Sequence, residues 1–137
     1  MATNYSVSLS KIIASEGYTE IYSPVPPKEV LVSAMEVSRP GLILARDDVN
    51  FSANRIQFIG TSEQLFLKGL PENEKAEDCV ERLMSRHPKA IVFSVSVTED
   101  IVDLFMPFAK KYEVPLLKSD SETSFSVSSL VSYLNDD

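Results

Sequence analysis

Two arginines and one polar turn are the residues of this sequence that could bind a small anion. Arg39 opens an Arg-Pro-Gly turn after an apolar run, and Arg55 opens the run RIQFIG, which leads into Thr61, Ser62 and Glu63. In a parallel α/β sheet, ligands bind beyond the carboxyl ends of the strands, where helix starts offer free N–H groups. We therefore expect both guanidinium groups to lie near the 61–63 turn. The alternative is that Thr61 caps a helix and the arginines pair with nearby acids, since Glu63 already supplies negative charge there.

The glycine loops that hold nucleotide phosphates are missing from the sequence. Its four glycines, at positions 17, 41, 60 and 69, begin neither G-x-x-x-x-G-K-[ST] nor G-x-G-x-x-G. Phosphoryl transfer needs backbone N–H groups and a lysine around the phosphates, with Mg²⁺ held by a hydroxyl and a carboxylate. We predict no catalytic residue, and no phosphoryl transfer by this chain alone.

Metal ligands and nucleophiles are also few. His87 is the single histidine and Cys79 the single cysteine, so a transition-metal site lacks ligands and a Ser–His–acid triad lacks support. His87 is better explained as a charge at a helix end, and Cys79 as a buried thiol on an apolar stripe. Asp47, Asp48 and Asn50 could hold a cation, but a solvated loop is the favoured interpretation. We predict no metal and no cofactor in this chain.

Length and charge limit the classes of function. A chain of 137 residues fits one domain, residues 1–137, and a fold of this size buries roughly two-thirds of its unfolded surface. The net charge of −7, with 13 basic residues against 20 acidic ones, argues against nucleic-acid and membrane partners. No signal peptide or membrane-length apolar run is present, and a single cysteine suits a reducing compartment, so we expect a cytoplasmic location.

The first half of the chain predicts irregular α/β structure. A short helix begins after Ser8 and ends at Gly17, which stands where a left-handed residue belongs. A strand over TEIY, an extended loop over 23–27 and a strand buried on both faces over 29–37 follow. The run RIQFIG predicts a strand with one covered and one partly polar face, and Thr61 with Gln64 forms a capping box for the next helix.

The second half alternates helices and strands. Helical stripes lie in 74–87, 98–113 and the segment after 123, and strands are expected over 90–97 and 115–118. This order favours right-handed crossovers and parallel pairing, hence a single three-layer α/β domain with a mixed, largely parallel sheet. We expect a central strand that contains Ile91, Phe93 and Val95. The helices packed over the sheet are expected to bury Phe105, Phe108, Leu130 and Leu134.

Three stretches, in order along the chain, resemble the N-terminal domain of HPr kinase/phosphorylase. They read VSRPGLILA from residue 37, NRIQFIGTSEQLFL from residue 54, and AIVFSVSVTEDIVDLFMPFAKKYEVPLLKSDSETSFSVSSLVSYL from residue 90. Together with the opening YSVSLSKII, the resemblance spans nearly the whole chain. The sequence departs from the family pattern at Arg46, where many relatives have glycine, at the strand end VFSVSV, and at Pro107, which stands inside a helix.

The resemblance implies a role as part of a larger protein. Such enzymes phosphorylate a serine of the phosphocarrier HPr with ATP or pyrophosphate, and also remove that phosphate, in carbon catabolite repression linked to the phosphotransferase system. The P-loop, Mg²⁺ and catalytic residues of the family lie in a C-terminal domain that this sequence lacks. The implied partners are that kinase domain, HPr and further copies of the parent protein.

Two functions from different classes remain open. The first is a regulatory or interaction domain of an HPr kinase/phosphorylase, and the second is a free-standing sensor for a small anion or nucleotide. The resemblance extends to the UDP-binding domain of the Mur peptide ligases, but likeness of fold does not establish nucleotide binding.

Overall fold

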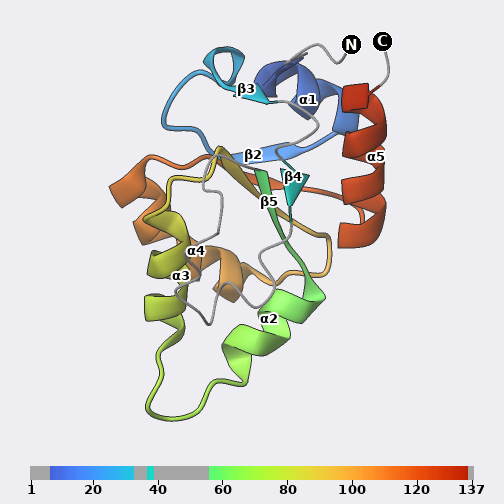
Figure 1. The fold of residues 1–137 in the computed structure, drawn as a ribbon. Coiled ribbons are helices and arrows are strands. Elements are labelled where there is room, and N and C mark those ends of the chain that lie inside the picture. Colours follow the sequence, from blue (N-terminus) through green and yellow to red (C-terminus); the bar gives the residue numbers. More distant parts are fainter. Residues whose placement is uncertain (1–6, 33–36, 39–55, 136–137) are drawn as a thin grey trace.

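The computed structural model describes residues 7–32, 37–38 and 56–135, and these form three layers around a mixed sheet. On one face of the sheet lie α2 (Thr61–Lys68), α3 (Ala76–Met84) and α4 (Glu99–Tyr112). The other face is covered by α1 (Leu9–Glu16) and α5 (Thr123–Asn135), which contact each other (Figure 1). The expected three-layer α/β class is confirmed.

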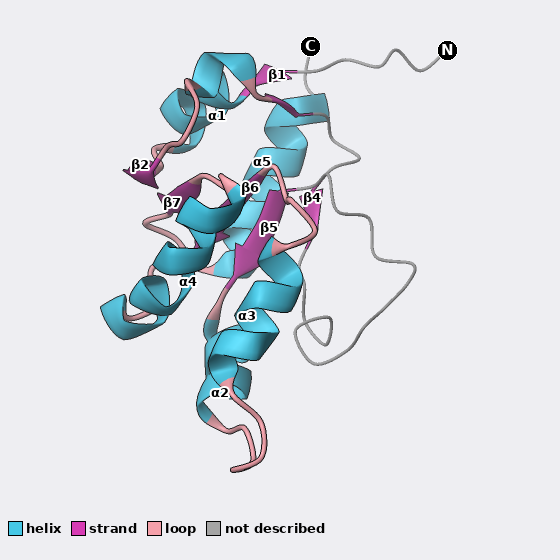
Figure 2. Cartoon of the chain, turned by 90° about the vertical axis from the view of Figure 1, so that its left-hand side faces the viewer, coloured by secondary structure: helices cyan, strands magenta, loops and turns pink. Residues whose placement is uncertain are grey.

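The main sheet has five strands in the order β2-β7-β6-β5-β4. They are β2 (Thr19–Tyr22), β4 (Val37–Ser38), β5 (Ile56–Ile59), β6 (Ala90–Phe93) and β7 (Leu116–Lys118). Strands β4 to β7 pair in parallel, and β2 joins β7 antiparallel at the edge (Figure 2). The sheet is therefore mixed and largely parallel, because only β2 runs against the other strands.

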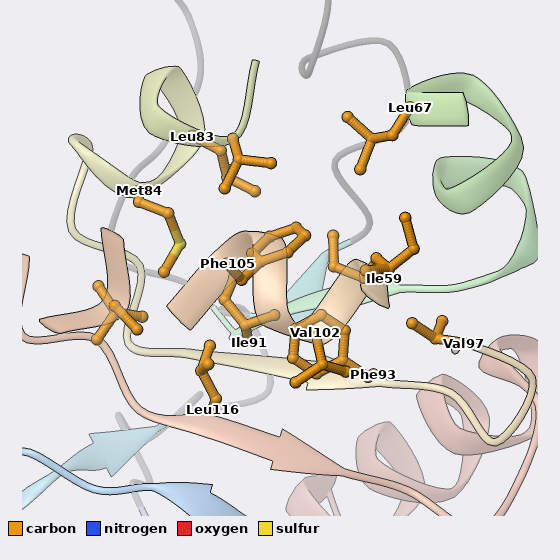
Figure 3. Packing of buried hydrophobic residues seen from close by; sticks show 14 of the residues in the cluster. Ile59, Leu67, Leu83, Met84, Ile91, Phe93, Val97, Val102, Phe105 and Leu116 are labelled. Atoms are coloured by element: carbon orange, nitrogen blue, oxygen red, sulfur yellow. The ribbon is translucent and has the colours of Figure 1, made fainter. Parts of the chain in front are cut away.

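Alternating residues of the central strand β6 build two separate hydrophobic clusters. Ile91 and Phe93 face α3 and α4, whereas Ala90 and Val92 face α1 and α5, as the period of two in a strand requires. Phe105 of α4 lies at the centre of the first cluster, and its ring meets that of Phe93 edge-on with centroids 5.1 Å apart (Figure 3). Both faces of β6 are thus buried, which confirms the prediction of a central strand.

The cap residues of α1 are those that the sequence predicts. The Ser8 hydroxyl accepts a hydrogen bond from the backbone N–H of Lys11 at 3.4 Å. Gly17 ends the helix at φ 71°, a left-handed conformation that side chains with a Cβ rarely adopt. Its N–H donates to the carbonyl oxygen of Ile13 at 3.0 Å. These two caps confirm the prediction and turn the chain directly into β2.

Three predictions about strands were wrong in detail. The expected strand over 29–37 is split between β3 (Leu31–Val32), which pairs with β1 (Val7–Ser8) in a small second sheet, and β4 of the main sheet. Val95 lies beyond the end of β6 and is 47% exposed, because its N–H donates to the carbonyl oxygen of Ser121 instead of a neighbouring strand. Gln57 is fully buried, so the expected partly polar face of β5 is covered.

Two prolines stand at the start of or inside a helix. The loop over 23–27 does not stay extended, because a 3-10 helix begins at Pro27, where a missing N–H costs nothing (Pro27–Glu29). Pro107 stands inside α4, and the helix continues through it to Tyr112 with Pro107 exposed to solvent. Water can therefore satisfy the carbonyl group that Pro107 leaves without an N–H donor.

Candidate functional site at the carboxyl edge of the sheet

Three parallel strands, β5, β6 and β7, end at the same edge, and a serine directly follows two of them. Ser94 comes directly after β6, and its N–H donates to the carbonyl oxygen of Ile59 in β5 at 2.9 Å. Ser119 comes directly after β7, and its N–H donates to the carbonyl oxygen of Phe93 in β6 at 2.8 Å. These bonds continue the sheet by one residue, so that the loops beyond it begin side by side.

Four side chains from these loops form a hydrogen-bonded group that we call the hydroxyl cluster: Thr61, Ser94, Ser96 and Glu122. The hydroxyl oxygen of Ser96 lies 2.8 Å from that of Thr61 and 3.2 Å from that of Ser94. Ser96 also donates to a carboxylate oxygen of Glu122 at 3.0 Å. Ser96 therefore joins the start of α2, the end of β6 and the residue before α5.

The first turn of α2 is capped one residue earlier than predicted. Gly60 is the N-cap, and its N–H donates to a buried carboxylate oxygen of Glu63 at 2.8 Å. Thr61 does not cap, because its hydroxyl is bonded to Ser96. The carboxylate of Glu63 therefore caps the start of α2 and is buried from solvent.

Gln64, expected to belong to the capping box, instead connects α2 with α4. Its side-chain oxygen accepts hydrogen bonds from the N–H of Thr98 at 2.8 Å and from the Thr98 hydroxyl at 3.2 Å. The single hydrogen of this hydroxyl is shared with Asp100, and that contact holds the pKa of the Asp100 carboxyl below its ordinary value. The start of α4 is therefore fixed to the start of α2 beside the hydroxyl cluster.

A lysine ends β7 at this edge. The Nζ of Lys118 donates to the carbonyl oxygen of Val97. Burial lowers the pKa of Lys118, although the negative charge of Glu99 opposes that shift. Lys118 supports the loop between β6 and α4, because Val97 belongs to that loop.

The predicted site residues are placed as follows. Thr61 belongs to the hydroxyl cluster, Ser62 is exposed, and Glu63 is buried in the cap of α2. Arg39 and Arg55 lie outside the described residues, so their convergence on this edge stays a prediction. Ser94, Ser96 and Glu122 were not among the predicted site residues, although two serines just after the apolar run of β6 were a usable signal.

The chemistry open to the cluster is hydrogen bonding. Each hydroxyl can both donate and accept, and the carboxylate of Glu122 accepts only. The carboxylate of Glu122 belongs to the cluster and that of Glu63 lies in the first turn of α2, so like charge opposes binding of an anion at this edge. A neutral polar group fits this set of side chains better than a phosphate does.

Cys79 and His87 lie away from this edge. Cys79 is buried in the first cluster, and burial raises the pKa of its thiol, as expected of an inert core cysteine. His87 follows α3 at φ 57° and is exposed, with its ring edge-on to Tyr112. Asp47, Asp48 and Asn50 lie outside the described residues. Within the described part of the chain, no group of three or more His, Cys, Asp or Glu side chains could hold a metal ion.

Comparison with known proteins assigns the family. The sequence model of the family described as HPr Serine kinase N terminus matches residues 7–134. An HPr kinase/phosphorylase of Caldicellulosiruptor bescii is 30% identical over 107 residues, which is 78% of this chain and 33% of that protein. One of Alkaliphilus metalliredigens is 27% identical over 131 residues, or 96% of this chain and 41% of that protein. The chain thus spans about a third to two fifths of these relatives, and it belongs to the family of HPr kinase N-terminal domains.

Proposed function

We propose that this chain is a non-catalytic regulatory or interaction domain of an HPr kinase/phosphorylase. The observation that carries the proposal is the family match over residues 7–134 in a sequence with no phosphate-binding glycine loop. The parent protein phosphorylates and dephosphorylates a serine of HPr, with ATP and Mg²⁺ bound in a separate kinase domain. The present domain contributes contacts to that kinase domain, to HPr or to other copies of the parent.

An interaction module needs a hydrophobic core of its own, and this domain has one. Its two hydrophobic clusters bury both faces of the central strand, so the fold has a core of its own. None of the helices in the described ranges is both long and apolar enough to cross a bilayer. We propose a cytoplasmic role in carbon catabolite regulation, where HPr and the kinase would both be available.

The test is a phosphorylation assay with the purified 137-residue chain, HPr, ATP and Mg²⁺, read by mass spectrometry of the HPr serine. We expect no phosphoserine above a control without the chain. The full-length parent protein, assayed in parallel, should give phosphoserine. Turnover by the chain alone would refute the non-catalytic role, and an inactive parent would refute its assignment as an HPr kinase.

A second candidate is a free-standing sensor domain, favoured by the hydroxyl cluster at the edge where α/β sheets bind ligands. The natural reading frame downstream of Asp137 distinguishes the two. A downstream G-x-x-x-x-G-K-[ST] motif supports the kinase-associated role, and a stop codon supports the sensor. Titration with phosphate and with a uridine nucleotide, followed at the amide of Thr61, would then test the anion or nucleotide expected from the sequence, which the carboxylates at this edge disfavour.

A further inference from the structure

Strand β2 ends the main sheet, and among the described strands only β7 pairs with it (Figure 2). The sheet does not use the backbone groups on its other side, and an edge of this kind is a template for a further strand. The sequence Thr19–Tyr22 contains neither lysine nor proline, which commonly protect such an edge. A bulge between Glu20 and Tyr22 shortens the regular part of the edge, so side-chain contacts must add to the affinity for an added strand.

An open cavity of about 370 Å³ lies beside this edge, between β2 and α4. Its apolar walls come from Ile21 of β2 and from Val102 and Met106 of α4. Glu99 and Asp103 stand one turn apart on α4, line the same cavity and are exposed to solvent. The cavity is therefore apolar along its walls and acidic where it opens to water.

The charges along this cavity favour a cationic side chain. Lys118 is the one basic residue that the structure places there, and its Nζ donates to the carbonyl oxygen of Val97. Two carboxylates against one ammonium group leave an excess of negative charge, and the net charge of −7 on the chain acts in the same direction. Arginine and lysine have the matching shape, because their methylene stems pack on apolar walls while their charged ends reach carboxylates.

A second cavity lies beside the same strand, on the face of the sheet that α1 covers. It measures about 290 Å³ and lies between α1, Glu20 of β2 and the 3-10 helix that begins at Pro27. Ile13, Pro26 and Pro27 give it apolar walls. Because the side chains of a strand alternate between its two faces, successive side chains of a strand added to β2 would point toward the two cavities in turn. Proteins recognise extended segments in this way, with backbone bonds for affinity and pockets for specificity.

We propose that the outer edge of β2 binds an extended segment of a partner protein in which a basic residue alternates with an apolar one. The backbone of this segment pairs with that of β2. Its basic side chain enters the cavity beside α4 and approaches Glu99 and Asp103, and its apolar side chain enters the cavity beside α1. The inference rests on the fold of this chain and does not depend on the proposed kinase role.

The test is a titration of the full 137-residue chain with a capped synthetic peptide that alternates arginine and valine over about seven residues, an ordinary strand length. The amide chemical shifts of Thr19, Ile21 and Asp103 should change saturably, and amides of β2 should exchange with solvent more slowly. Two control peptides should not bind. One has glutamate in place of arginine, and the other keeps every side chain but has methylated backbone nitrogens, which cannot donate to a strand.

A pair of matched charge reversals tests the cavity beside α4. Asp103→Lys should raise the Kd of the arginine–valine peptide roughly 3- to 10-fold, because attraction at an exposed pair becomes repulsion. Glu72→Lys makes the same change of net charge in the loop before α3, outside both cavities, and should raise the Kd less than about 2-fold, since salt screens distant exposed charges. Both positions are exposed, so both variants should unfold at the wild-type denaturant midpoint.

Three results would overturn the proposal. Absence of saturable shifts with the arginine–valine peptide would remove the site. Equal binding of either control peptide would mean that the basic side chains or the backbone of the segment take no part. Equal weakening by Asp103→Lys and Glu72→Lys would mean that the net charge of the chain, and not this cavity, attracts the peptide.

Discussion

Replacing Phe105 by alanine would remove the ring at the centre of the cluster between the sheet and α3 and α4 (Figure 3). Phe105 is fully buried, and burial of an aromatic side chain removes about 150–250 Å² of its surface from contact with water. At about 25 cal/mol per Å², this burial corresponds to roughly 4–6 kcal/mol. Alanine retains a small part of that area, so we expect Phe105→Ala to lower the free energy of unfolding by about 3–5 kcal/mol.

The measurement is urea unfolding followed by circular dichroism, with the midpoint and slope fitted separately. Phe125→Ala is the matched control, because that ring is 65% exposed and its loss should change stability by less than about 0.5 kcal/mol. A double-mutant cycle with Phe93→Leu should also give a coupling of about 0.5–1.5 kcal/mol for the edge-on ring pair. If Phe105→Ala and Phe125→Ala proved equally mild, the assignment of the core to this face of the sheet would be wrong.

Three further substitutions test local features by the same unfolding measurement. Gly17→Ala should cost about 1–2 kcal/mol and Gly17→Asn less, because nothing lies within 4 Å of an added Cβ and only the left-handed backbone opposes it. Glu63→Ala should cost about 1–3 kcal/mol by leaving the Gly60 N–H unpaired, whereas Glu63→Gln keeps an acceptor; equal losses would refute the cap. The bond from Lys111 lowers the pKa of Glu81, so the stability difference between wild type and Glu81→Gln should be present above about pH 4.3 and vanish as the pH falls through the lowered pKa. A difference that stays constant from pH 7 to pH 2 would contradict that reasoning.

Elements with a long, regular pattern could be predicted from the sequence. The stripe of Cys79, Val80, Leu83 and Met84 in α3 is buried as its helical spacing indicates. The caps of α1 could be predicted from Ser8 at one end and Gly17 at the other, because each bonds to a residue only three or four positions away. In these cases the residues that decide the structure are close together in the chain.

Features decided by distant residues could not be predicted in this way. The hydroxyl of Thr61 fits a helix cap by its spacing, but in the fold it bonds to Ser96, 35 residues away. Val95 continues the alternation of β6, yet its N–H turns to the loop before α5. The run over 29–37 carries apolar residues on both faces, and nothing in its own sequence shows that its two ends join different sheets.

The pairing of β2 with β7 has a consequence during synthesis. Lys118, the partner of Thr19, lies 99 positions later in the chain, and α1 packs against α5, which comes later still. At about 5–20 residues per second, the ribosome needs roughly 5–20 s between these two strands. Throughout that interval the apolar side chains of the nascent N-terminal segment, Leu9 and Ile12 among them, lack the surface that buries them in the finished domain. A chaperone that shields exposed apolar segments should therefore bind this nascent chain early and leave only after α5 has emerged.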